Sequence, residues 1–272
     1  MLKTLLASCG VAVASLSIAC AEVPRVVTDI APVTAIVASV MEGVGAPNGL
    51  VEVSVSPHDF VLRPSQARII ETGDLMIWVG PGLSPALERS FQALAPSAPN
   101  LVLVDDETAD PHAWLDPALV RRWVGRINEE LSRLDPANAA TYRENAERLS
   151  ADLNRLQSAL AQDLADLGET RVWTYHDGLG VFAAAFGFEI AGALSDGDGH
   201  KPSAKQLSAM KADLSENTGC LLVEPEINAA KLKASLGVKI VEADILGQRI
   251  ASPENFYANL MQGLARSLLG CR

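Results

Sequence analysis

The alternation of short apolar runs with helical stretches restricts the fold of this chain more than any other feature. It is typical of a parallel sheet with crossover helices, and it occurs once in each half of the chain. The predicted strands are residues 25–28, 51–55, 75–79 and 101–104, then 172–175, 189–191, 220–223 and 239–241. The predicted helices between and after them are residues 33–41, 64–72, 85–94, 179–186, 203–216, 229–236 and 253–269. The sequence therefore predicts an α/β protein with two parallel sheets and flanking helices.

A strandless stretch, roughly residues 117–167, separates the two halves. Leucines recur there at spacings of three or four residues, on one face of a helix: Leu149, Leu153, Leu156, Leu160, Leu164 and Leu167. No Gly or Pro interrupts residues 137–167, which favours one helix of about 45 Å over two shorter ones. Asp135, followed by Pro136, is a suitable N-cap for this helix. We expect two lobes, residues 22–135 and 168–272, joined by a long helix at 136–167.

The first residues have the composition of a signal peptide. Lys3 supplies a positive charge, residues 5–18 are apolar, and residues 19–21 fit a small-x-small cleavage site. We therefore expect export to the periplasm with cleavage after Ala21. A transmembrane anchor is disfavoured because the apolar run is shorter than about 18–20 residues. Lipidation of Cys20 is a second alternative, although the residues before it form a poor lipobox.

The charge and cysteine content agree with an exported protein. Asp and Glu total 33 against 22 Lys and Arg, and no basic stripe is present, so nucleic acid is a poor candidate partner. Cys220 and Cys271 are the two cysteines that remain after removal of the leader. In an oxidising compartment such a pair is interpreted as one disulfide, the alternative being two buried free thiols.

The residues that can carry chemistry are few. The chain has four histidines, and His58, His112 and His176 each follow or end a predicted strand, as Asp244 does. Ligands of parallel α/β proteins bind beyond the carboxyl ends of the strands. Two of these four residues come from each half of the chain. Three imidazoles and one carboxylate suit tetrahedral zinc, so we predict a metal site in a cleft between the lobes.

Four segments, in order along the chain, resemble the zinc and manganese solute-binding proteins of ABC importers (cluster A-I). They are residues 56–65 (SPHDFVLRPS), 110–117 (DPHAWLDP), 175–178 (YHDG) and 242–247 (EADILG). The resemblance implies two α/β lobes joined by a long helix and a metal held in the cleft by His58, His112, His176 and Asp244. It also implies a periplasmic receptor that is not an enzyme, transports Zn²⁺ as its ligand and delivers it to an ABC permease membrane subunit. We expect a monomer. Cys220 and Cys271 match a disulfide of the zinc-uptake branch.

The same resemblance bears on the identity of the metal. Manganese receptors of this family typically carry a carboxylate where this chain has His176, and imidazole-rich sites favour zinc. A manganese receptor is the alternative. A zinc hydrolase is less favoured because four protein ligands leave no open position and no His-Glu-x-x-His helix is present. An adhesin or metal-dependent structural protein is a third class.

Several details stay open. The chain departs from many zinc-uptake members in lacking a His-rich loop, since only residues 105–110 (DDETAD) precede His112, and Ile245 stands where many relatives have Pro. Glu224 or Glu242, rather than Asp244, is an alternative source of the oxygen ligand. His200, in a Gly-rich loop, is interpreted as an exposed non-ligand, with a transient zinc ligand as the alternative.

Overall fold

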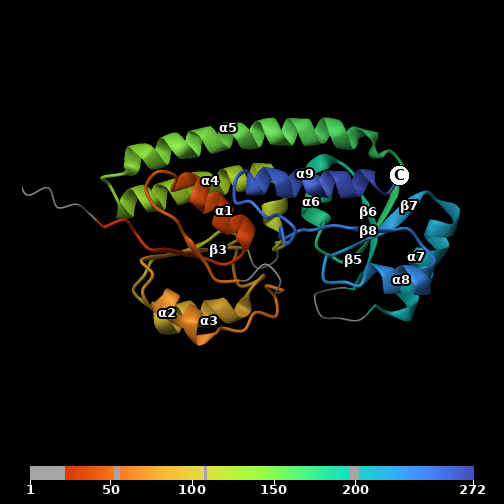
Figure 1. Cartoon of the computed structure of the whole chain (residues 1–272), viewed down its shortest axis with the longest axis horizontal. Helices are drawn as coiled ribbons and strands as arrows, with labels where there is room; N and C mark the ends of the chain where they lie inside the picture. Colours follow the sequence, from red (N-terminus) through yellow and green to blue (C-terminus); the bar gives the residue numbers. More distant parts are fainter. Residues whose placement is uncertain (1–21, 52–55, 107–108, 196–201) are drawn as a thin grey trace, which may run out of the picture.

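The computed structural model describes residues 22–51, 56–106, 109–195 and 202–272. The predicted signal peptide and His200 lie outside these residues. Two α/β lobes lie next to each other along the long axis of the molecule, and the long helix α5 (Ala139–Leu164) runs past both (Figure 1). Within the described residues, no helix is long and apolar enough to cross a membrane.

The first lobe contains a four-stranded parallel sheet in the order β2-β1-β3-β4. Its central strand, β3, is buried along its whole length, as expected for a parallel sheet covered by helices on its faces. The strands are β1 (Val26–Thr28), β2 (Asn48–Gly49), β3 (Leu75–Trp78) and β4 (Asn100–Val102). The helices are α1 (Ala31–Val40), α2 (Pro64–Glu71) and α3 (Pro85–Leu94).

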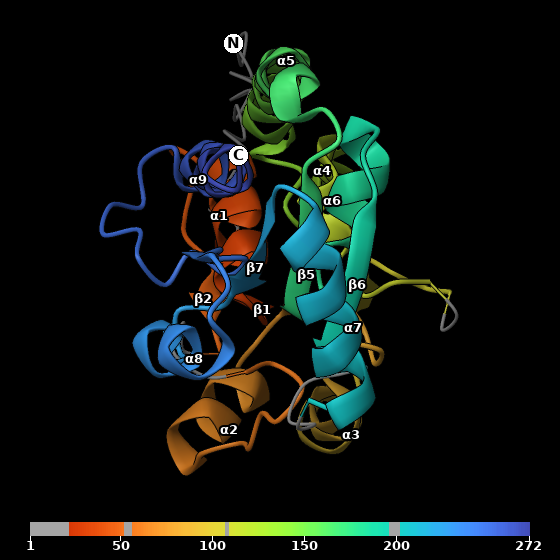
Figure 2. The ribbon, with the colours of Figure 1, turned by 90° about the vertical axis from the view of Figure 1, so that its right-hand side faces the viewer.

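The second lobe repeats this arrangement in the order β6-β5-β7-β8, again with parallel neighbours. Its strands are β5 (Arg171–His176), β6 (Ile190–Ser195), β7 (Gly219–Val223) and β8 (Ile240–Glu242). Its helices are α6 (Gly180–Phe186), α7 (Ala204–Glu216), α8 (Ala229–Leu236) and α9 (Phe256–Leu269). Helix α9 packs against both α5 and α1, and Figure 2 shows α5 and α9 end-on, parallel to the long axis. The two-lobed α/β fold is thus confirmed.

The link between the lobes consists of α4 (Pro117–Leu134) and α5, which continues as a 3₁₀ turn over Ala165–Leu167. The predicted leucine stripe lies on the buried face of α5. The prediction that Asp135 caps the N-terminus of this helix is wrong, because α5 begins at Ala139. The buried Asp135 carboxylate instead accepts hydrogen bonds from the Asn138 amide (2.7 Å) and the Tyr142 hydroxyl (2.8 Å), which hold the turn between α4 and α5.

The second strand of the first sheet is short. Of the predicted residues 51–55, residues 52–55 lie outside the described part of the chain. The strand that pairs with β1 is Asn48–Gly49, with Gly49 opposite Thr28. Residues 56–63, which carry His58, form neither helix nor strand.

The predicted disulfide is present. Cys220 in β7 and Cys271, just after α9, are bonded, with their Cα atoms 5.0 Å apart. Both cysteines are fully buried. The bond therefore ties the end of the chain to an inner strand of the second sheet.

Candidate metal centre

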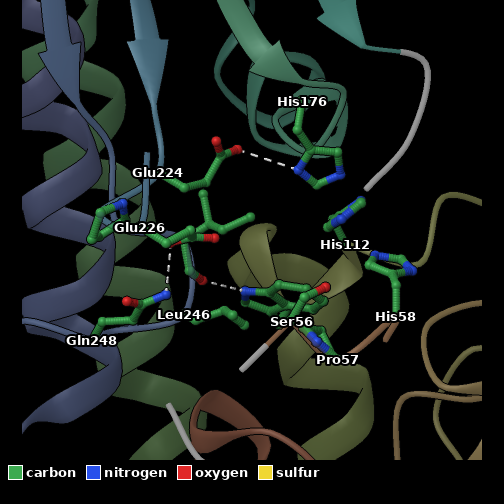
Figure 3. Close-up of a pocket in the computed structure, with 12 residues that line it drawn as sticks. Ser56, Pro57, His58, His112, His176, Glu224, Glu226, Leu246 and Gln248 are labelled. Atoms are coloured by element: carbon green, nitrogen blue, oxygen red, sulfur yellow. Dashed lines mark hydrogen bonds and ion pairs between the residues drawn. The ribbon is translucent and has the colours of Figure 1, made fainter. Parts of the chain in front are cut away.

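A cleft opens where segments that follow the strands of both lobes meet. The first lobe contributes the loop after β2 and the segment after β4, and the second lobe contributes the ends of β5, β7 and β8 (Figure 3). The lining residues are Ser56, Pro57, His58, His112, Trp114, His176, Glu224, Pro225, Glu226, Ile245, Leu246 and Gln248. This is the place that the strand-end argument predicted for a ligand.

Three of the four predicted ligands come together in this cleft. His58, His112 and His176 each offer a ring nitrogen, and these three nitrogens lie within 4.8 Å of one another. The ring centroids are 5.0 Å apart for His112 and His176 and 5.6 Å apart for His58 and His112. His112 and His176 are buried, with 4% and 8% of their surface exposed. Three converging imidazoles from two lobes form a donor set of the kind that zinc prefers.

The His112 ring is held by a carboxylate of its own segment. Asp110 Oδ1 lies 2.7 Å from His112 Nδ1 and also accepts the His112 backbone N–H at 2.9 Å. Burial raises the pKa of the Asp110 carboxyl, but the hydrogen bond to His112 and the charge of that ring outweigh burial and lower it. An ionised Asp110 favours the proton on Nδ1, which leaves Nε2 of His112 with the free lone pair.

The His176 ring has a carboxylate partner from a neighbouring strand. Glu224 Oε1 lies 3.3 Å from His176 Nδ1, and both side chains are nearly buried (Figure 3). The parallel register of β5 and β7, with Thr174 opposite Leu222, places these two residues at equivalent positions two residues further along. Glu224 thus favours the same tautomer in His176 that Asp110 favours in His112.

Asp244, the fourth predicted ligand, is not brought into the histidine group. Its Oδ1 accepts the backbone N–H groups of Gly247 (2.7 Å) and Gln248 (2.9 Å), and its Oδ2 accepts that of Arg249 (2.7 Å). The carboxylate therefore closes the turn of residues 244–249. The next two residues of this turn, Ile245 and Leu246, line the cleft.

The other acidic residues considered in the sequence analysis do not line the cleft. Glu242 pairs with Arg249 on the exposed side of β8, at 3.1 Å. In the acidic loop, the exposed Asp105 pairs with Arg126 at 3.4 Å, and residues 107–108 lie outside the described chain. Sequence reasoning did not identify Asp110 as the partner of His112. The signal was present, because an Asp two residues before the bonded N–H is typical of an Asx-turn.

The comparison with known families agrees with this geometry. The family model described as "Zinc-uptake complex component A periplasmic" matches residues 26–271, which is nearly the whole described chain. The chain belongs to this family. Members of the zinc-uptake component A family are periplasmic, as the family description states. The resemblance drawn from the four sequence segments is thereby confirmed.

Individual relatives support the assignment. The high-affinity zinc uptake system protein ZnuA of Paracoccus denitrificans (strain Pd 1222) is 34% identical, and the alignment covers 92% of each chain. Two solved structures share the fold of the family. The periplasmic zinc-binding protein TroA from Treponema pallidum has a TM-score of 0.77 at 22% identity, covering 90% of this chain and 99% of TroA. The solute-binding protein FpvC from Pseudomonas aeruginosa, in complex with Mn²⁺, has a TM-score of 0.78 at 20% identity, covering 92% and 98%.

Proposed function

We propose that the chain is the high-affinity zinc-binding receptor of an ABC importer, which captures Zn²⁺ in the periplasm and delivers it to the membrane permease. The observation that carries this proposal is the convergence of His58, His112 and His176 from two lobes in a cleft, in a member of the zinc-uptake component A family. The receptor acts as a monomer and is not an enzyme. It is exported by its signal peptide, which is cleaved after Ala21.

The proposed ligand set is His58, His112, His176 and Asp244. The Nδ1 atoms of His112 and His176 face carboxylates, so both rings offer Nε2 to the ion. Asp244 supplies the oxygen ligand; its carboxylate accepts backbone N–H groups of the turn whose residues Ile245 and Leu246 line the cleft. Glu224 is the alternative oxygen donor, because it lines the cleft and contacts His176.

Zinc is the favoured metal over manganese. Three imidazoles are borderline-soft donors, and the Irving–Williams order places manganese well below zinc for the same ligands. Coordination requires neutral imidazoles, so zinc affinity falls as the pH drops toward the usual His pKa of about 6.5.

The decisive experiment is metal competition on the purified mature chain, residues 22–272. We expect one tightly bound zinc ion per chain that equimolar manganese does not displace. Preferential binding of manganese would reject the metal assignment. Zinc titration of His58→Ala, His112→Ala, His176→Ala and Asp244→Ala then tests the ligands, with Glu224→Ala as the competing variant. Full affinity in Asp244→Ala together with lost affinity in Glu224→Ala would transfer the oxygen ligand to Glu224.

A further inference from the structure

One tryptophan of the first lobe connects the two sides of the cleft. Trp114 lies two residues after His112, in the 3₁₀ turn Ala113–Leu115, and is fully buried. Its indole N–H donates to the Ile245 carbonyl at 2.9 Å, and its own carbonyl accepts the Tyr257 hydroxyl at 2.7 Å. Its ring packs on the His112 ring, with 5.3 Å between centroids.

These bonds join parts of the chain that are remote in sequence. Ile245 follows Asp244 in the turn after β8, and Tyr257 is in the first turn of α9. Both partners are buried, with 6% and 7% of their surface exposed. An indole N–H or hydroxyl that stays buried and loses its acceptor bears the full desolvation cost, so any shift within the closed core that breaks either bond is penalised.

We propose that Trp114 is a positioning residue that fixes the metal-ligand segment of the first lobe to the turn 244–249 of the second. The indole cannot act as a ligand, because its ring nitrogen is only a donor. It instead holds the His112 ring on one side and the Ile245 backbone on the other, so that the His112 segment and the turn 244–249 keep their relative position before an ion enters. Such preorganisation lowers the cost of binding and slows release. This inference rests on the proposed function as a metal receptor.

The test is Trp114→Phe, which keeps a large aromatic ring next to His112 and removes the N–H donor. The matched control is Trp123→Phe, the same change at a tryptophan of α4 that is buried in the hydrophobic core. We expect Trp114→Phe to release zinc about tenfold faster, as the loss of one buried hydrogen bond allows, with little change in Trp123→Phe. Tyr257→Phe should accelerate release in the same direction, by a smaller factor.

A spectroscopic readout separates positioning from general stability. With Co²⁺ as the probe, we expect the ligand-field bands to change in Trp114→Phe and to stay unchanged in Trp123→Phe, even where both variants melt at lower temperature. Wild-type zinc release and wild-type cobalt bands in Trp114→Phe would overturn the inference, as would equal changes in the control. If Trp114→Phe does not fold, wild-type release by Tyr257→Phe overturns it. Failure of the wild type to bind zinc would reject the proposed function instead.

Discussion

The two lobes hold their buried histidines in different ways. In the first lobe, His112 is fixed by a residue two positions away, since Asp110 bonds both its ring and its backbone N–H within 2.9 Å. In the second lobe, His176 is fixed by Glu224, 48 residues away, at the longer distance of 3.3 Å. The contact in the first lobe depends only on the local turn of residues 110–112. The contact in the second lobe depends on how β5 and β7 pair in the sheet. The two halves of the site should therefore respond differently to changes in their own lobes.

The second lobe strengthens the strand on which its half of the site depends. Glu224 directly follows β7, and Cys220 of the same strand is bonded to Cys271. The disulfide thus anchors β7 at one end while Glu224 faces His176 at the other. The first lobe also has a carboxylate directly after an inner strand, because Asp29 follows β1 as Glu224 follows β7. Asp29 is buried and accepts the backbone N–H of Val79 at 2.8 Å.

The largest expected effect comes from removing that disulfide. In the chain-entropy model, a cross-link that closes a loop of about 50 residues contributes about 4 kcal/mol to the free energy of unfolding. The double variant Cys220→Ala/Cys271→Ala should lose about this amount in urea denaturation of the metal-free protein. Zinc should restore part of the loss, because it binds the folded state. The expectation would be contradicted if the double variant unfolded at the same urea concentration as the wild type, once thiol titration has shown that the wild type is oxidised.

The next effect concerns the buried carboxylate of the first lobe. Burial raises the pKa of Asp29 to about 6, although the backbone amides of Val79 and Ile30 lower it in part. The folded pKa lies above the unfolded value of 3.8, so the folded state binds the proton more tightly. The stability from this proton is complete below about pH 4 and is lost as the pH rises through about 6, a difference of about 3 kcal/mol.

Asp29→Asn tests this titration. The amide keeps an oxygen acceptor for the Val79 N–H and does not ionise. In urea denaturation of the metal-free protein between pH 4 and pH 7.5, the free energy of unfolding of the variant should rise relative to that of the wild type as the pH rises. Parallel stability curves for the two proteins would reject the raised pKa.

The third prediction compares the two histidine partners directly. Carboxylates that orient ligating imidazoles change metal affinity by about 10- to 100-fold when removed. We expect Asp110→Ala to lie near the upper end of this range and Glu224→Ala near the lower end, because the Asp110 contact is shorter and is reinforced by the backbone bond. Competitive zinc titration measures both, and Asp110→Asn and Glu224→Gln serve as controls that keep an oxygen acceptor. A larger loss in Glu224→Ala would reverse the comparison and favour Glu224 as a direct ligand.

Much of the fold could be predicted because its signals are local. Helices α3 and α8 begin and end at the predicted residues, since each amphipathic stretch is bounded by Ser-Pro or by Asn and Gly. The start of α5 was predicted too early because the side-chain bonds of Asp135 to Asn138 and Tyr142 leave no trace in a propensity pattern. The short strand β2 was not among the predicted strands for a related reason, because pairing with β1 and not its own composition selects it.

The same distinction applies to the site. The convergence of the three histidines followed from their places at strand ends, which is a topological argument. The contact between Glu224 and His176 depends on the register of β5 against β7, and the bond from Trp114 to Ile245 spans 131 residues. Neither contact joins residues at a regular sequence spacing, so no sequence pattern could have predicted it. The closure of the turn by Asp244 is local, but its effect on metal binding stays a prediction.

The smallest expected effect tests how closely the second lobe surrounds its histidine. A Cβ atom added to Gly178 would lie 2.8 Å from His176 Cε1 and 3.3 Å from Ile245 Cδ1. The His176 ring can yield, but only by turning away from the ion or from Glu224, so Gly178→Ala should weaken zinc binding by about tenfold, or about 1.4 kcal/mol. Gly125→Ala is the matched control, because Gly125 lies in α4 and an added Cβ would meet nothing within 4 Å. The control should keep its zinc affinity and gain up to about 1 kcal/mol of stability from the higher helix propensity of Ala. Equal zinc affinity in the two alanine variants would mean that the residues around His176 make room for the added Cβ without disturbing the ring, which would contradict the expectation.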